Sequence, residues 1–223
     1  MKTLLGTTSK PEEVIIDQHF NWTTITEYRD EIKIFYQNRE FKPVWFNKNS
    51  LNPLGEELIT ELKESWKEGI PEPTGFLTNI ENALIQLSNS SSTDNPKAQI
   101  ITEADVSLTQ LYFDFASKIY SGILDPAELE VIWEILPDEI DLVEHLEVAL
   151  TKGDISGSFN QLRPKHEQYD LLLEAFSNLL QLKNSGGWPL PGNMPVLKEN
   201  ESHNNIALVK KHLQATGDHN ETD

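Results

Sequence analysis

TEADVSLTQLYFDFASKIYSG, residues 102–122, is the stretch that decides the fold. Its large apolar side chains recur at intervals of three and four residues, which places them on one face of a helix. They are Leu108, Leu111, Tyr112, Phe115 and Ile119. Thr102 and Asp105 have the spacing of a capping box, with Thr102 as the cap, and Gly122 is a typical helix stop. The stretch therefore predicts an amphipathic helix from about Thr102 to Gly122.

The same helical period recurs on both sides of this stretch. It marks residues 25–36, 54–66, 76–87, 140–150, 169–180 and 206–213. Asp125 followed by Pro126 predicts the cap and first residue of a further helix that runs to about Ile135. Residues 39–48 are expected to form an extended connector, and residues 89–96 a mobile loop. Because period-two alternation is nearly absent, we predict an all-α fold, an irregular bundle of about seven or eight helices.

The domain organisation follows from where these helices lie. Residues 1–22 are polar and irregular and are expected to be a flexible N-terminal segment. Residues 23–185 form the predicted helical domain. Residues 186–223 begin with a loop rich in proline and glycine and contain one last helix. Three parts are therefore expected.

Charge and composition exclude several classes of function. The formal net charge is -18, from 36 acidic and 18 basic residues, which disfavours binding to nucleic acid. No run of about 18 apolar residues is present, so no membrane span is expected. There is no cysteine, which excludes a disulfide, a thiolate zinc site and a cysteine nucleophile in this chain. Residues 1–10 lack the apolar segment of a signal peptide, so the compartment stays open between the cytoplasm and export with the signal removed.

The search for catalytic, cofactor and metal residues gives no candidate. The histidines lack the paired spacing of zinc hydrolases, and we expect His145 to lie on a solvated polar face rather than to bind a metal. The acidic run from Asp138 to Glu147 lacks the spacing of a calcium loop and suits a helix start. We interpret Ser156-Gly157-Ser158 as a turn with no base beside it, and no phosphate-binding glycine loop occurs. We therefore expect no catalytic residue, no cofactor and no metal.

Tryptophans are the remaining candidates. Trp45, Trp66 and Trp133 fall at helical or anchoring positions and are expected in the core. Trp188 lies in a stiff loop, Gly186-Gly187-Trp188-Pro189-Leu190-Pro191. The favoured interpretation is that Trp188 docks the loop onto the helices, and the alternative is a contact with a partner or ligand.

Several motifs, in order along residues 25–218, resemble one family, the large YcbB-type L,D-transpeptidases. Four motifs resemble stretches of that family, the first at the start of its scaffold region, and the last resembles the first helix of a peptidoglycan-binding module. They are Phe35-Tyr36 with Arg39 running into Pro43-Val44-Trp45-Phe46, then Ser121-Gly122-Ile123-Leu124-Asp125-Pro126, then Leu162-Arg163-Pro164-Lys165-His166-Glu167-Gln168-Tyr169, then Gly186-Gly187-Trp188-Pro189, and last Thr216-Gly217-Asp218.

The resemblance implies a non-catalytic part of an enzyme that forms 3→3 cross-links in peptidoglycan by cysteine acyl transfer. Residues 23–185 would be the scaffold domain, and residues 186–223 the start of a truncated peptidoglycan-binding module. The scaffold would support or position a catalytic domain in the periplasm, with that domain or peptidoglycan as partner. Two departures stand against a full match: the cysteine motif is missing, and Glu199–His203 replaces the pattern expected before the last helix.

Two other interpretations remain open. The first is a stand-alone helical adaptor of the cell envelope without enzymatic activity. The second is an enzyme that uses an unrecognised pair of carboxylates, which a deep acidic cleft would support.

Overall fold

The computed structural model describes residues 14–89, 94–124, 140–190 and 192–218. Its elements are α1 (Ile16–His19), η1 (Trp22–Thr24), α2 (Arg29–Asn38), β1 (Phe46–Asn47), β2 (Ser50–Leu51), α3 (Pro53–Glu64), η2 (Ser65–Glu68), α4 (Thr74–Asn89), α5 (Asp94–Ser121), α6 (Leu142–Lys152), α7 (Ile155–Leu162), α8 (Glu167–Asn184) and α9 (Ile206–Thr216). Over these ranges the two-residue strands β1 and β2, paired antiparallel, form the only sheet, so the all-α prediction is confirmed.

The chain divides into two compact units, residues 1–164 and 165–223. The predicted helical domain, residues 23–185, spans this division. Unit 1 contains α1 to α7, and unit 2 contains α8 and α9. None of the described helices is long and apolar enough to cross a bilayer.

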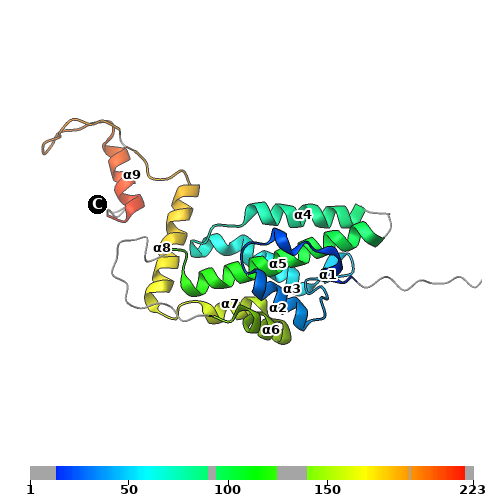
Figure 1. The fold of residues 1–223 in the computed structure, drawn as a ribbon. Coiled ribbons are helices and arrows are strands. Elements are labelled where there is room, and N and C mark those ends of the chain that lie inside the picture. Colours follow the sequence, from blue (N-terminus) through cyan, green and yellow to red (C-terminus); the bar gives the residue numbers. More distant parts are fainter. Residues whose placement is uncertain (1–13, 90–93, 125–139, 191, 219–223) are drawn as a thin grey trace, which may run out of the picture. The chain divides into compact units, whose positions relative to one another are not determined.

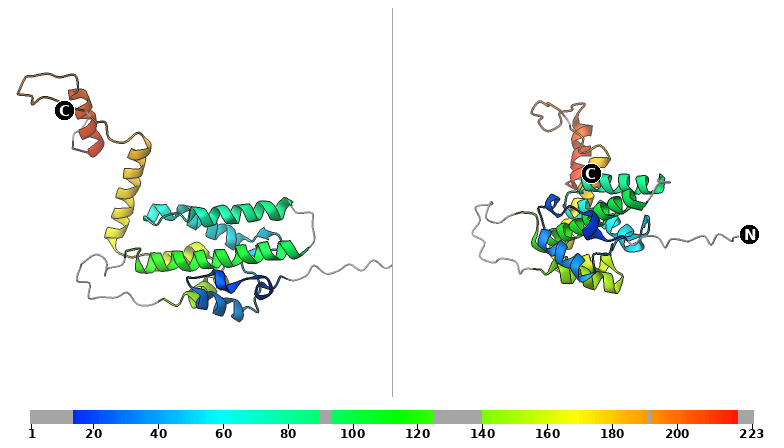
Figure 2. Two further views of the ribbon diagram at one scale, coloured as in Figure 1. Left: turned by 45° about the horizontal axis from the view of Figure 1, so that its top comes forward. Right: turned by 45° about the vertical axis from the view of Figure 1, so that its right-hand side comes forward.

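Helix α5 is the centre of unit 1, where it contacts α1, α2, α3, α4, α6 and α7 (Figure 1). It lies beside α4 in every view (Figure 2). The predicted stripe is buried: Leu108 and Tyr112 are fully enclosed, and Phe115 is nearly so. Burying one such side chain contributes about 1.5–3 kcal/mol, so this stripe supplies much of the core.

The start of α5 differs from the prediction of a cap at Thr102. The helix begins at Asp94, and both Thr102 and Asp105 lie inside it, fully buried. Pro96 occupies the first turn, where a missing N–H breaks no helical hydrogen bond, so it does not end the helix. The capping-box interpretation is therefore wrong, and Asp105 has a different role.

Two short helices, α1 and α7, were not expected. Helix α1 falls in the range expected to be flexible, residues 1–22, yet Ile16 is fully buried and its N–H donates to Phe41 O at 2.8 Å. Helix α7 contains the Ser156–Ser158 stretch interpreted as a turn. The Asp154 side chain caps it by accepting a hydrogen bond from Gly157 N, which converts the small residues into a first helical turn.

Most predicted helix ends are confirmed. Asn52 caps α3 through a hydrogen bond from Gly55 N, with Pro53 at the first position. Gly153 and Gly217 end α6 and α9 with positive φ. Trp66, expected in the core, is 43% exposed. The reason is that α3 gives way to the tighter η2 turn, which shifts Trp66 off the α-helical stripe.

In unit 2, the predicted helices are confirmed as α8 and α9. The His166 side chain caps α8 by accepting from Gln168 N, and Gly186 and Gly187 follow its end with positive φ. The loop is tied to α9 by a hydrogen bond between His212 Nδ1 and Pro189 O, 2.9 Å apart. The predicted helix over residues 125–135, together with Trp133, lies outside the described residues.

Candidate functional site

Asp105 organises a buried polar network at the centre of unit 1. Its carboxylate accepts the Tyr36 hydroxyl at 2.6 Å, the Val44 N–H at 3.0 Å and the Trp45 N–H at 2.8 Å. Thr109, one turn along α5, accepts the Trp45 indole N–H at 2.9 Å and lies 2.8 Å from the Tyr36 hydroxyl. One helix thereby fixes α2 and the segment that leads into β1.

The electrostatics of this network are those of a buried acid. Burial raises the pKa of Asp105 to about 6, although the hydrogen bonds from Tyr36, Val44 and Trp45 favour its ionised form. Burial, and then the charge of Asp105, raise the pKa of Tyr36 well above its usual value. Backbone N–H groups of an irregular segment would otherwise lack acceptors, so the carboxylate satisfies them in place of secondary structure.

A second network joins α5, α6 and α7. The Tyr112 hydroxyl lies 2.8 Å from His145 Nδ1 and 3.0 Å from Ser158 Oγ. His145 Nε2 lies 3.3 Å from the carbonyl oxygen of Ser158. Because that carbonyl can only accept, Nε2 carries the proton and Nδ1 accepts from Tyr112.

This arrangement corrects two expectations. His145 is half-buried in a helix interface rather than on a solvated polar face, and it supplies a base near Ser158. Burial, followed by the charge of Lys152, lowers the pKa of His145. The Ser158 hydroxyl, however, is buried and donates to Ile155 O at 2.6 Å. A serine without access to substrate cannot act as a nucleophile, so the network holds three helices together.

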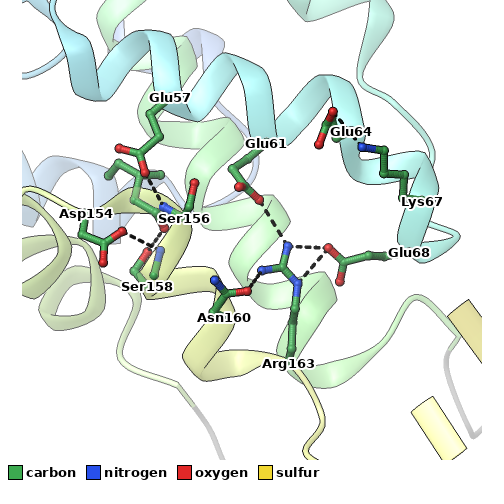
Figure 3. Close-up of polar contacts among 12 residues, drawn as sticks. Glu57, Glu61, Glu64, Lys67, Glu68, Asp154, Ser156, Ser158, Asn160 and Arg163 are labelled. Carbon is green, nitrogen blue, oxygen red and sulfur yellow. Dashed lines mark hydrogen bonds and ion pairs between the residues drawn. The ribbon is translucent and has the colours of Figure 1, made fainter. Parts of the chain in front are cut away.

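Arg163 forms a third cluster at the end of unit 1 (Figure 3). Its guanidinium donates to Glu68 through Nε at 2.9 Å and also through Nη2, and to Glu61 at 3.2 Å. Asn160 accepts a further hydrogen bond from Nη1. Burial alone would lower the pKa of Arg163, but the hydrogen bonds and charges of Glu68 and Glu61 raise it. Arg163 therefore pins α7 to α3 and η2, just before unit 2 begins.

Figure 3 also shows how α3 reaches the start of α7. The Glu57 carboxylate accepts the Ser156 N–H at 2.8 Å, beside the Asp154 cap. A carboxylate close to the first N–H groups of a helix satisfies donors that have no partner within the helix. Together with the Arg163 pairs, this contact aligns α3 and α7 at both ends of their interface.

The remaining candidates from the sequence lie apart from these networks. Among the described residues, no group of three or more histidines, aspartates and glutamates is placed to hold a metal ion. Of the acidic run, Asp141 caps α6 through Glu144 N, and Glu147 pairs with Arg39 at 3.0 Å. The other two members, Asp138 and Glu139, lie outside the described residues. Trp188 is 45% exposed, so its two interpretations both remain.

Helix α8 carries an uncovered apolar stripe in unit 2. Leu172, Phe176 and Leu179 recur at helical spacing on one face and are 68%, 38% and 51% exposed. No residue of α8 is buried. An amphipathic helix whose apolar stripe has no cover within its unit is typical of an interaction surface.

The motif residues share one property: they hold backbone or helices in place. Tyr36, Trp45 and Arg163 belong to the networks above, His166 caps α8, and Gly122 closes α5 with positive φ. Asp105, Thr109, Tyr112 and Ser158 were not predicted from the sequence as a polar set. The signal was present, since all four are polar groups at or beside a strongly apolar stripe, and buried polar groups need partners.

Comparison with known proteins agrees with this picture of a structural domain. The family model described as “Scaffold domain” matches residues 30–176. No curated protein and no solved structure matches the chain. The match covers most of the chain and includes the three networks and the first half of α8. The chain therefore belongs to the Scaffold domain family, consistent with the resemblance of its motifs to the scaffold region of L,D-transpeptidases.

Proposed function

We propose that this chain is the non-catalytic scaffold of a peptidoglycan L,D-transpeptidase of the YcbB type, and that it supports or positions a catalytic domain at the cell wall. The observation that carries the proposal is the match to the Scaffold domain family over residues 30–176. The order of the motifs along the chain supports the narrower assignment to the L,D-transpeptidase family. The absence of cysteine supports it as well, because cysteine acyl transfer then needs a nucleophile from outside these residues.

The geometry suits a supporting role. The polar side chains with shifted pKa values are each hydrogen-bonded to other protein groups; they are Tyr36, Asp105, Tyr112, His145 and Arg163. Perturbed groups of this kind, each satisfied by a neighbouring helix, are typical of structural networks. The alternative of an enzyme with a carboxylate pair is therefore not favoured.

The stripe Leu172–Phe176–Leu179 on α8 is the surface that we assign to the catalytic domain. The buried centre of an interface is more apolar than the rest of a protein surface, and an uncovered apolar stripe suits such a centre. The stripe is exposed in unit 2 and begins within the matched family range. The same stripe would also serve the adaptor alternative, and reading the gene for a cysteine-bearing segment separates the two.

An assay on muropeptides tests the proposal. The purified chain should release no product from a tetrapeptide donor, and turnover by this chain alone would refute the scaffold role. Addition of the separately produced cysteine-bearing domain should restore cross-linking, and the two should bind each other.

The variant Leu172→Ser/Phe176→Ser should weaken that binding about tenfold or more, since buried apolar anchors dominate interfaces. Glu174→Ser, on the opposite face of α8, is the matched control and should bind normally. Unchanged binding of the stripe variant would remove α8 as the docking surface. If the double variant instead lowers the melting temperature of the isolated chain, the α8 stripe is packed within the chain itself and is not a free docking surface.

A further inference from the structure

A groove between α2 and α6, two neighbouring helices of unit 1 (Figure 1), has no role in the networks above. It has a volume of about 870 Å³. Three β-branched side chains line it: Ile34 from α2, with Ile140 and Val143 beside the start of α6. Ile34 is 48% exposed. An apolar floor of this size between two helices is large enough to accept one face of a helix from another protein.

The charge of the groove is of one sign. Four of the described lining residues are acidic, Glu31, Asp141, Glu144 and Glu147, and none is basic. Two of these acids are already engaged: Asp141 caps α6, and Glu147 pairs with Arg39. The carboxylates of Glu31 and Glu144, one from each helix, form no hydrogen bond or ion pair with any described residue, although the Glu144 backbone N–H donates to Asp141. The groove therefore presents an apolar floor between two unpaired carboxylates.

We propose that this groove binds a cationic amphipathic helix of a partner protein. Apolar side chains of that helix would cover Ile34, Ile140 and Val143, and lysine or arginine side chains would pair with Glu31 and Glu144. Charge complementarity selects this occupant, because acids on both sides of the groove repel an acidic segment and attract a basic one. Long basic side chains also suit the rim, since their stems pack on apolar surface while the charge stays in water.

The neighbouring segment of the chain is the rival occupant. Residues 125–139 precede Ile140 and contain several apolar side chains, but they carry six carboxylates and no lysine or arginine. Placed on these acids, such a segment would set like charges against one another. The same argument disfavours a second copy of this chain, whose net charge is -18. These two charge arguments do not use the proposed scaffold function. The groove proposal can therefore be tested independently of that function.

Titration of the full chain against synthetic peptides tests the proposal. The probe is a fluorescent helical peptide with one leucine face and one lysine face. Two matched peptides keep the length: one replaces lysine by glutamate, and the other replaces leucine by serine. Only the leucine–lysine peptide should bind, and added salt should weaken its binding, because exposed charges are screened. Equal binding of the serine–lysine peptide would show that charge alone attracts the peptide, and it would overturn the proposal that the groove binds an apolar helix face.

Variants locate the binding. Glu31→Gln/Glu144→Gln should weaken the complex roughly fivefold, and Ile34→Ser should weaken it by a similar factor, without changing the melting temperature by more than a few degrees. Glu174→Gln, an exposed helical glutamate on α8, is the charge-matched control and should leave binding unchanged. Equal weakening by the control would place the peptide elsewhere and refute the proposal.

A competing peptide that copies residues 125–139 completes the test. Failure of this peptide to displace the leucine–lysine probe supports an external cationic partner. Displacement by it, lost in the Ile34→Ser variant, would assign the groove to the chain itself and overturn the proposal. These outcomes are read without any transpeptidase assay, so they do not depend on the experiment that tests the scaffold role.

Discussion

The hydroxyl of Tyr36 lies 2.6 Å from the carboxylate of Asp105, a buried contact between residues 69 positions apart in the chain. The carboxylate also accepts two backbone N–H groups, so donors from three residues converge on it. Thr109 extends the network to the indole of Trp45. The network therefore joins three parts of the chain: α2, α5 and the segment that precedes β1. We expect their stabilities to be coupled.

The first prediction concerns the acceptor at the centre of this network. Asp105→Asn should lower the free energy of unfolding by about 3 kcal/mol, because an amide NH₂ would face backbone donors in a buried site. Chemical denaturation measures the change. Asp114→Asn, on the same helix but in a partly exposed pair with Lys118, should change it by less than about 1 kcal/mol. Equal effects of the two variants would contradict the assigned role of Asp105.

The second prediction contrasts two fully buried threonines of α5. Among the described residues, the Thr102 hydroxyl has no hydrogen-bond partner, whereas Thr109 contacts Tyr36 and Trp45. Thr102→Val should therefore be neutral or stabilise the fold by up to about 1 kcal/mol, because it removes an unsatisfied polar group. Thr109→Val should destabilise it by about 1–3 kcal/mol. Thermal melts of both variants check the contrast, which fails if Thr102→Val is the more damaging.

The third prediction concerns pH. Burial lowers the pKa of His145 in the folded state. As the pH falls below the ordinary histidine value of about 6.5, the unfolded chain takes up a proton before the folded chain does. Stability supplied by neutral His145 is therefore present above this pH and is lost as the pH decreases.

The measurement is the difference in unfolding free energy between the parent chain and His145→Gln. That difference should shrink from pH 7.5 to pH 5. Asp105 acts in the opposite direction, because its pKa is raised to about 6 and the folded state gains a proton first. Taking the difference between the two proteins cancels that contribution. A difference that is constant with pH would contradict the assigned state of His145.

The fourth prediction concerns Arg163. Arg163→Met removes the guanidinium that pairs with Glu61 and Glu68, whose side chains are 21% and 9% exposed. The free energy of unfolding should fall by about 2–3 kcal/mol. Lys63→Met breaks the exposed pair with Glu81 and should change it by at most about 1 kcal/mol. The additional variant Arg163→Met/Glu68→Gln should recover part of the loss, and absence of recovery would place the effect in packing rather than charge.

How far the sequence predicts this structure depends on the kind of signal. Apolar stripes that carry a cap or stop signal predict helices well, because periodicity and capping are local. Examples are α3, which begins after Asn52, and α6, which ends before Gly153. Helix α1 was missed because its four residues are too few to show a stripe, and it is held by contacts such as the burial of Ile16. Helix α7 was missed because its short stripe, Ile155, Phe159 and Leu162, is interrupted by Ser156-Gly157-Ser158. Tertiary packing, rather than propensity, decides such short elements.

The polar networks show the same limit. Thr102 and Asp105 have the spacing of a capping box, and the local interpretation was wrong because α5 extends upstream past Pro96. Nothing in the sequence near Asp105 points to Val44 or Trp45. The acidic groove was not predicted either, because its lining residues are far apart in the sequence. Ile34 and Val143 come together only when α2 packs against α6.

The distance in sequence between Asp105 and its donors has a consequence for how the protein is made. While the chain emerges from the ribosome, Tyr36, Val44 and Trp45 are synthesised some sixty residues or more before their acceptor. Until α5 is complete, these donors lack the acceptor that they have in the folded protein. Such long-range contacts slow folding, because the loop must close before the contact is formed. We therefore expect the N-terminal third of unit 1 to complete its fold only after α5 has been synthesised.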